Sequence, residues 1–316
     1  MADLEVEVPR ITLRQLKVFD AVARHLSHTR AAAELFLTQP TVSMQIGQLE
    51  HQLGVALFEQ FGKRIHLTDA GREVYQYGRA IAQQLDELDA VLARLKGVSG
   101  GHLKVSVATT ANYFMPRRLA DFTRRHPGVT ASLDITNREV LLKQLGENAV
   151  DLVVMGKPPD DAALEAGRFM DNPLVIIGPP NHPLARMKRI PLARLEQETF
   201  LVRERGSGTR AAMERFFAEH KMTLRTGMEV GSNEAIKRSV EAGLGLGLMS
   251  PHAVEMELRL KRLAILPVVD FPLMRHWYVV HRRGKRLSPA AATFKEFLLQ
   301  GENGRHKARA GRARGK

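Results

Sequence analysis

The spacing of apolar residues changes once along this chain, and that change limits the folds open to it. Up to about residue 95, apolar side chains recur every three or four residues, which is the period of an α-helix. Beyond residue 101, short apolar runs typical of strands alternate with segments of helix length. The length of 316 residues also exceeds what one hydrophobic core usually supports. We therefore expect a small all-α domain followed by a larger α/β region.

The first 67 residues have the pattern of a winged helix-turn-helix. A first helix is predicted from Leu13 to Leu26, an alanine-rich second helix over 30–35, and a third from Pro40, which suits a first turn, to Gly54. Two short strands around a turn are expected over 58–67, and they would form the wing. The alternative is a plain three-helix bundle with an inert polar surface. The wing that follows the third helix argues against it.

The start of the predicted third helix carries the residues expected to read DNA. Its hydroxyl and amide side chains can donate to and accept from base edges. The helix holds no Lys or Arg, so phosphate contacts are expected from the second helix and the wing. The candidate DNA-binding residues are Arg30, Thr38, Gln39, Pro40, Thr41, Ser43, Gln45, Lys63 and Arg64. The net charge of +13 favours a polyanionic partner, although charge alone does not separate DNA from RNA or anionic lipid.

A connecting helix is predicted over 68–97, and its apolar seam favours pairing between two chains. The seam alternates steps of four and three residues and consists of Gly78, Ile81, Leu85, Leu88, Leu92 and Leu95. A single amphipathic helix lying on its own domain would show a similar but broader stripe. A homodimer would present two reading helices to the two half-sites of a near-palindrome. The segment Gly97 to Gly101 is expected to form a hinge.

The region 98–300 is expected to bind a small molecule in a cleft between two lobes. Lobe I would comprise 101–172 and 272–300, and lobe II 173–271, with the chain crossing near Asn172 and Phe271. Strands are predicted at Leu103–Val107, Leu133–Ile135, Leu152–Met155, Val175–Ile177, Phe200–Val202, Met228–Val230, Leu246–Met249, Leu263–Leu266 and Trp277–Val280. Open sheets of this kind bind ligands beyond the carboxyl ends of their strands.

Four polar turns at predicted strand ends supply the candidate ligand contacts. Each precedes a helical pattern, and helix N-termini offer free N–H groups and a positive dipole end to a carboxylate or phosphate. The candidate residues are Thr109, Thr110, Asn112, Thr136, Asn137, Arg138, Arg205, Ser207, Thr209, Arg210 and Asn233. For any one Thr or Ser, an ordinary N-cap is the more common role. Recurrence at four strand ends favours an anion sensor.

Several classes of site are not expected. The chain has no cysteine, its 12 histidines form no metal-binding motif, and neither a nucleophile elbow nor a phosphate loop is present. Gly243, Gly245 and Gly247 lack the nucleotide-binding spacing and predict close helix-to-strand packing. No catalytic residue, metal or resident cofactor is therefore expected. We also expect no membrane span, no secretory signal and hence a cytoplasmic protein, with a basic, disordered tail over 301–316.

The N-terminal residues resemble those of LysR-type transcription regulators. The resemblance is dense and lies in Thr29-Arg30-Ala31-Ala32, Leu37-Thr38-Gln39-Pro40-Thr41-Val42-Ser43, Leu49-Glu50, Leu53-Gly54, Leu57-Phe58 and Leu67-Thr68-Asp69-Ala70-Gly71. Within that family, the chain is most similar to activators of the Calvin-cycle carbon-fixation (RuBisCO) operon. The stretches that carry this similarity are Ala23-Arg24-His25-Leu26-Ser27-His28-Thr29, Ser43-Met44-Gln45, and Phe58-Glu59-Gln60 with Lys63-Arg64-Ile65-His66-Leu67.

The resemblance covers about Leu13 to Leu299 and implies a fold and a function. It implies that the α/β region is a two-lobed, periplasmic-binding-protein-like effector domain, with a phosphorylated Calvin-cycle sugar intermediate or NADPH as effector. It also implies promoter DNA and RNA polymerase as partners and a homotetramer as the assembly. The alternatives are a LysR-type regulator of another metabolic operon, a solute-binding receptor without a DNA role, and an α/β enzyme. The absence of catalytic motifs opposes the enzyme, and the predicted wing opposes the receptor.

Overall fold

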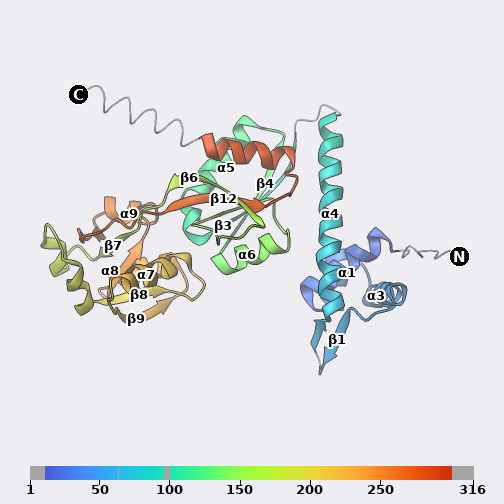
Figure 1. The fold of residues 1–316 in the computed structure, drawn as a ribbon, viewed down its shortest axis with the longest axis horizontal. Coiled ribbons are helices and arrows are strands. Elements are labelled where there is room, and N and C mark those ends of the chain that lie inside the picture. The colour runs from blue at the N-terminus through green and yellow to red at the C-terminus, as the bar shows by residue number, and fades with distance from the viewer. Residues whose placement is uncertain (1–10, 63, 96–99, 301–316) are drawn as a thin grey trace. The chain divides into compact units, whose positions relative to one another are not determined.

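The computed structural model describes residues 11–62, 64–95 and 100–300. The chain divides into two compact units, Met1–Asp89 and Ala90–Lys316, each of which is visible in Figure 1. Lys63, most of the predicted hinge and the basic tail 301–316 lie outside the described residues. The domain boundaries predicted at 67, 97 and 300 stay predictions.

The first unit folds as three short helices and a hairpin, as predicted. The elements are α1 (Leu13–His25), α2 (His28–Leu35), α3 (Gln39–Leu53), β1 (Phe58–Phe61) and β2 (Arg64–Leu67), and β1 pairs antiparallel with β2. Each helix begins at a hydroxyl N-cap, Thr12, Ser27 or Thr38, whose oxygen accepts a backbone N–H three residues on. Gly54 ends α3 with a positive φ of 68°, a conformation that costs glycine little.

One core holds these elements together and fixes the hairpin to them. Val18, Phe19, Val42 and Leu49 are buried side by side, and the small Ala31 lets α2 approach the neighbouring helices closely. In addition, one carboxylate oxygen of Glu50 accepts the backbone N–H groups of Leu57, at 2.7 Å, and of Phe58, at 3.2 Å. The hydrogen bonds from α3 therefore set where the wing begins.

A long helix, α4 (Asp69–Leu95), follows the wing. The hydroxyl of Thr68 accepts the N–H of Gly71 at 2.9 Å, as an N-cap does, and donates to the carbonyl of Ala56 at 2.8 Å. Gly71 lies so close to this segment that a Cβ there would stand 2.1 Å from the carbonyl oxygen of Leu57. The start of α4 is thus attached tightly to the wing.

The second unit contains two five-stranded sheets with helices on their faces. The first sheet has the order β4-β3-β5-β12-β6, and the second β11-β7-β10-β8-β9. In chain order, the first half of the second unit consists of β3 (Gly101–Ala108), η1 (Thr109–Tyr113), α5 (Met115–Arg125), β4 (Val129–Thr136), α6 (Arg138–Gly146), β5 (Leu152–Met155), β6 (Leu164–Asp171) and β7 (Val175–Gly178). Its second half consists of η2 (Pro183–Arg186), η3 (Leu192–Gln197), β8 (Thr199–Arg203), α7 (Gly208–Glu219), β9 (Arg225–Val230), α8 (Asn233–Glu241), β10 (Leu246–Met249), η4 (Pro251–Ala253), α9 (Glu255–Arg259), β11 (Ala264–Ile265), β12 (His276–Arg282) and a helix over 289–300.

The chain crosses between the two sheets twice, and the two crossings are hydrogen-bonded to each other. It leaves the first sheet after β6 and returns to it at β12. Leu174 and Leu273 form an antiparallel bridge, and the N–H of Asn172 donates to the carbonyl of Arg275 at 2.8 Å. This paired connection joins two lobes, each with its own buried core. The α/β region with two lobes that the sequence predicts is confirmed.

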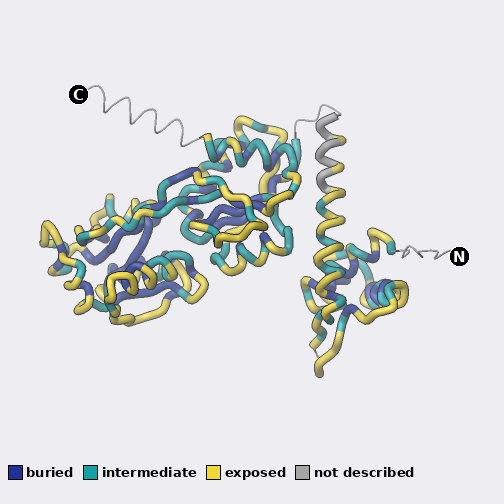
Figure 2. The backbone as a smooth tube through the Cα atoms, viewed as in Figure 1, coloured by how far each residue is buried: buried dark blue, intermediate teal, exposed yellow. Residues whose placement is uncertain are grey.

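Burial concentrates in the strands, as the dark backbone of Figure 2 shows for the second unit. Gly245 and Gly247 serve packing, as expected, whereas a Cβ on Gly243 would have no neighbour within 4 Å. A Cβ on Gly245 would lie 2.5 Å from the carbonyl oxygen of Thr199, and one on Gly247 would lie 3.2 Å from Ile177, Ile236 and Val240. Gly245 therefore permits β10 to lie against β8.

The predicted strands are all present, but one strand was not predicted. β6 (Leu164–Asp171) pairs antiparallel with β12 at the edge of the first sheet. Its first five residues are exposed or half-buried, and only Phe169 and Met170 are buried. Because an edge strand with a solvated face contains few apolar residues, it shows no apolar run.

Candidate functional site

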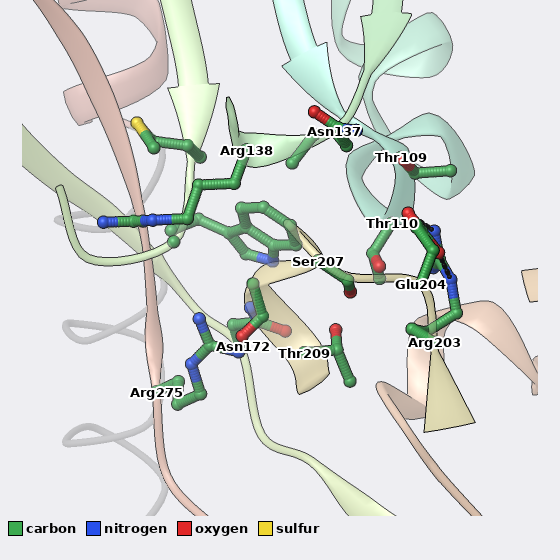
Figure 3. Close-up of a pocket in the computed structure, with 15 residues that line it drawn as sticks. Thr109, Thr110, Asn137, Arg138, Asn172, Arg203, Glu204, Ser207, Thr209 and Arg275 are labelled. Atoms are coloured by element: carbon green, nitrogen blue, oxygen red, sulfur yellow. Dashed lines mark hydrogen bonds and ion pairs between the residues drawn. The ribbon is translucent and has the colours of Figure 1, made fainter. Parts of the chain in front are cut away.

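A cavity lies where the two lobes of the second unit face each other (Figure 3), with about 450 Å³ of space including its open mouth. Hydroxyl and amide groups dominate its wall, so we call it the hydroxyl cavity. The residues that line it are Ala108, Thr109, Thr110, Asn137, Arg138, Met155, Gly156, Asn172, Arg203, Glu204, Ser207, Gly208, Thr209, Arg275 and Trp277.

The sheet topology explains why these residues meet. In the first sheet β3 runs parallel to β4 and β5, and in the second β8 runs parallel to β9 and β10. The carboxyl ends of parallel strands lie at the same edge of a sheet, where the following loops and helix N-termini gather. The hydroxyl cavity is lined by the segments that follow β3, β4 and β5 in one lobe and β8 in the other.

Six of the predicted ligand contacts line this cavity: Thr109, Thr110, Asn137, Arg138, Ser207 and Thr209. Two of them are also N-caps. The side-chain oxygen of Asn137 accepts the N–H of Val140 at 3.0 Å, and that of Ser207 accepts the N–H of Arg210 at 3.5 Å. Capping and cavity lining therefore coexist at α6 and α7, because the first turn of each helix faces the cavity.

The other five predicted contacts lie outside the wall of this cavity. Asn112 is exposed in η1, and Thr136 uses its backbone carbonyl to accept from the hydroxyl of Thr109 at 3.1 Å. Asn233 is buried, where its amide nitrogen donates to Thr110 at 3.3 Å and its oxygen accepts from Arg203. Arg205 and Arg210 line a neighbouring cavity, together with Arg138 and Ser207.

The guanidinium of Arg210 already has acidic partners. It donates to Glu214 at 2.7 Å and to Glu229 at 2.5 Å, and these hydrogen bonds raise its pKa. The same contact holds the pKa of Glu229 below its usual range. Arg210 therefore stabilises the packing of α7 against β9, and the structure does not leave its charge uncompensated.

Two groups on the cavity wall that the sequence did not suggest have unsatisfied hydrogen-bonding capacity. Trp277 and Asn172 are both buried, yet the indole Nε1–H of Trp277 and the side-chain oxygen of Asn172 have no partner among the described residues. A buried donor or acceptor without a partner costs free energy, on the order of 1–3 kcal/mol. Both residues line the cavity, so a polar ligand there is a candidate partner for these groups.

Two arginines give the cavity a positive end, and only Arg138 was predicted. Figure 3 shows the guanidinium groups of Arg138 and Arg275 at one end of the cavity and Thr109, Thr110 and Arg203 at the other. Burial, together with the charges of Arg138 and Arg215, lowers the pKa of Arg275 to about 10. Burial, together with Arg215, also lowers the pKa of Arg138. Both lack a carboxylate partner among the described residues.

This arrangement suits recognition of an anion more than catalysis. Hydroxyls and an indole N–H can donate to carboxylate or phosphate oxygens, and arginines can bind them in a fork. Within the described ranges, no group of His, Asp and Glu side chains has the geometry to hold a metal ion. In the same ranges, no helix combines the length and apolar character needed to cross a bilayer.

The first unit presents the residues that the sequence assigns to DNA. Thr38, Gln39 and Pro40 are exposed, and Thr41, Ser43 and Gln45 are half-exposed. The amide of Gln39 donates to the hydroxyl of Ser43 at 2.9 Å. The buried face of the same helix consists of Val42, Ile46 and Leu49. The polar face of α3 is therefore available to a partner.

The predicted phosphate contacts flank that face. Arg30 is exposed on α2, and its guanidinium donates to the carbonyl of His25 at 2.7 Å. Arg64 is exposed at the first position of β2, in the wing. The role assigned to Lys63 remains a prediction on a residue outside the described ranges.

The helix α4 carries an apolar stripe that its own unit leaves exposed. Ile81, Leu85, Leu88 and Leu92 are all exposed, and Leu88 keeps 51% of its accessible surface. The side chain of Leu95 lies outside the described part of the structure. An exposed stripe with steps of four, three and four matches the seam of a two-helix coiled coil.

Comparisons with known families agree with both units. Residues 13–72 match the model described as bacterial regulatory helix-turn-helix protein, lysR family, and residues 96–302 match the LysR substrate binding domain. The chain is 58% identical over 289 residues to the RuBisCO operon transcriptional regulator of Allochromatium vinosum, which covers 92% of this chain and 96% of that protein. It is 45% identical to the HTH-type transcriptional activator CmpR of Synechocystis sp., over 91% of this chain and 95% of that one.

Solved structures show the same fold. The regulatory domain of CcmR from Synechocystis PCC6803 in complex with 2-PG is 40% identical, has a TM-score of 0.62, and covers 64% of this chain and 97% of its own. Full-length CbnR complexed with its target DNA has a TM-score of 0.66 at 23% identity, over 92% of this chain and 100% of that chain. The family matches and the close relatives together show that the chain belongs to the LysR family of bacterial transcription regulators.

Proposed function

We propose that this chain is an activator of carbon-fixation genes that senses a small anionic metabolite in the hydroxyl cavity. The names of its relatives support the gene class, because proteins 58% and 46% identical to it are called RuBisCO operon transcriptional regulators. The 2-PG complex of the CcmR regulatory domain supports a small-molecule effector for this type of domain. The proposed effectors are a phosphorylated sugar intermediate of carbon fixation or NADPH.

The strongest support for the sensor proposal comes from the donors on the wall of the hydroxyl cavity. Trp277 places an unpartnered N–H on a cavity wall that also holds Arg138 and Arg275, two cations without a carboxylate partner among the described residues. Buried polar groups are nearly always satisfied, so a wall with uncompensated donors implies a ligand rich in acceptors. An anionic metabolite has that character.

The proposed binding partners are inferred from the two units and from the exposed stripe of α4. We propose that α3 binds promoter DNA in the major groove, with Arg30, Arg64 and Lys63 at the phosphates. The exposed stripe of α4 would pair with a second copy, and two dimers would form a tetramer that bends DNA and recruits RNA polymerase. Effector binding would shift the angle between the lobes and change this geometry more than it changes affinity. The predicted location is the cytoplasm.

Calorimetry on the full-length chain tests the effector site. Thr209→Val keeps the side-chain volume but removes a hydroxyl from the wall, so affinity for the phosphorylated sugar should fall about tenfold, as for loss of a hydrogen bond to a charged group. Thr223→Val, at an exposed position outside the cavity, is the matched control and should bind as the wild type does. Equal affinity of the two variants for every metabolite tested would contradict the site.

The second candidate is a LysR-type regulator of another metabolic operon, which shares the fold and the cavity. The same chain distinguishes the two when it is offered several promoter fragments at one salt concentration. Preferential binding to a carbon-fixation promoter is the expected result. Preference for an unrelated promoter would favour the second candidate.

A further inference from the structure

A second cavity adjoins the first and has a different chemistry. It lies between one face of α7, the loop after β5 and the segment that leads into β12, with about 1210 Å³ of space including its open mouth. Its cationic side chains are Arg138, Lys157, Arg215 and Arg275, and its carboxylates are Asp160 and Glu219. We call it the arginine cavity.

The positive charges of this cavity are mostly uncompensated. Lys157 pairs with Asp160 at 3.5 Å, but none of the three arginines has a carboxylate partner among the described residues. The guanidinium groups of Arg138 and Arg275 donate instead to the backbone carbonyls of Lys157, at 2.6 Å, and Gly208, at 3.1 Å. These contacts orient the two groups without neutralising them.

The three arginines also repel one another. After burial, which is the main cause, Arg138 and Arg215 each act to lower the pKa of Arg275, and Arg215 likewise lowers that of Arg138. Like charges held together at a partly buried site lower the stability of the folded chain unless a counter-charge is present. A phosphate offers two or more oxygens to guanidinium forks and carries the charge that the cluster lacks.

We propose that the arginine cavity is a second anion site, which binds a phosphate group beside the ligand of the hydroxyl cavity. Arg138, Gly208 and Arg275 line both cavities, so the two sites share a wall. This proposal rests on the anionic effector of the proposed function and adds a phosphate-binding site to it. The phosphate belongs either to the far end of one effector with two anionic groups or to a separate phosphate compound.

Arg215 is the residue that separates the two sites experimentally. It lines the arginine cavity, is absent from the wall of the hydroxyl cavity, and is exposed, so its substitution preserves the core. Arg194, exposed on η3 of the same lobe and outside both cavities, is a control with the same change of charge.

The test is calorimetry of full-length wild type, Arg215→Gln and Arg194→Gln at fixed salt, with inorganic phosphate, fructose 6-phosphate and fructose 1,6-bisphosphate as probes. Arg215→Gln should weaken binding of at least one phosphate probe about tenfold or more, as expected for a lost charge-assisted contact, and Arg194→Gln should not. If one ligand bridges both cavities, Arg215→Gln should weaken binding of the bisphosphate, and the wild type should bind one bisphosphate molecule per chain. If a separate phosphate compound occupies the arginine cavity, Arg215→Gln should abolish a second binding event and leave the first binding event unchanged.

The proposal is overturned when Arg215→Gln and Arg194→Gln bind all three probes as the wild type does. If Thr209→Val still weakens effector binding in that case, the proposed function stands and only the second site is lost. If the wild type binds none of these probes and no other anionic metabolite, the proposed function fails together with it.

Discussion

Single residues decide what the hydroxyl cavity can bind. The hydroxyls of Thr109, Thr110 and Thr209 are common groups, but an unpartnered indole N–H on a cavity wall is rare. Its cost to the folded chain is recovered only when a ligand accepts from it. Removal of this N–H should therefore weaken ligand binding, while it removes a cost to the stability of the ligand-free chain.

The first prediction at this scale concerns Trp277. Trp277→Phe keeps an aromatic ring against Phe114 but removes the N–H donor. Calorimetry should show effector affinity reduced about tenfold, because the lost hydrogen bond is made to a charged acceptor. Any fall in the melting temperature of the ligand-free chain should come only from the smaller ring volume of Phe, and loss of the N–H should add nothing to it. Unchanged affinity would show that the indole does not contact the effector.

The second prediction concerns Arg275 and its dependence on pH. Because the pKa of Arg275 is depressed to about 10 in the folded chain, folding carries a penalty wherever the guanidinium is charged in both states, which is below about pH 10. Arg275→Gln should therefore raise the free energy of unfolding at pH 7 by about 1–3 kcal/mol, after the lost bond to Gly208 offsets part of the gain.

Thermal unfolding at pH 7, 9 and 11 checks this result. The difference between Arg275→Gln and wild type should be constant up to pH 9 and should shrink above pH 10, as wild-type Arg275 loses its proton. A variant less stable than wild type at pH 7 would contradict the account of an uncompensated charge.

The sequence identified only part of the cavity, for a physical reason. Thr109, Asn137 and Ser207 were found because each lies in a segment that connects a strand to the following α-helix, a position that sequence patterns show. Trp277 belongs to a strand and is buried in the core of its lobe, and Asn172 and Arg275 lie on the crossings between lobes. Their roles depend on how the two crossings pair, which no local pattern reveals.

At the scale of elements, the spacing of apolar residues was sufficient to predict nearly every helix and strand. The N-caps Ser27 and Thr38, the end of α3 at Gly54 and the two wing strands all follow from local chemistry. The strand β6 was missed because it lies at a sheet edge and is mostly polar. Elements that bury only a few side chains leave a weak signal in the sequence.

The DNA-reading role proposed for α3 gives a prediction about this element. Gln39→Ala should weaken binding to the specific promoter about tenfold, while binding to unrelated DNA stays the same, because the amide is proposed to contact base edges. Arg64→Ala in the wing should weaken both and reduce the slope of affinity against salt by about one. Gel shifts at several salt concentrations measure both quantities. Equal losses for both variants on both DNAs would contradict the division of roles.

The stripe on α4 gives a second prediction about an element. Leu88→Glu places a charge in the proposed seam and should dissociate the proposed dimer, since a buried unpaired charge is costly. Ala80→Glu introduces the same side chain at an exposed position outside the seam and should leave the dimer intact. Sedimentation of both variants at micromolar concentration checks this. A dimer in both would place the interface elsewhere.

At the scale of the whole molecule, the chain combines a DNA-reading unit with a two-lobed unit that carries uncompensated donors between its lobes. The order of these units was predictable, because the period of apolar residues changes between them. The identity of the effector was not, because four separate strand ends and two crossings create the cavity together. The proposed class of effector comes from the resemblance to regulators of carbon fixation, and the polar groups of the cavity are compatible with it.

The most direct test is a DNase I footprint of the full-length chain on a carbon-fixation promoter, with increasing concentrations of a phosphorylated sugar intermediate. We predict that the footprint or the sites of enhanced cleavage change with metabolite for the wild type and not for Thr209→Val at the same concentrations. A footprint that the metabolite leaves unchanged in the wild type, or alters equally in Thr209→Val, would contradict this prediction.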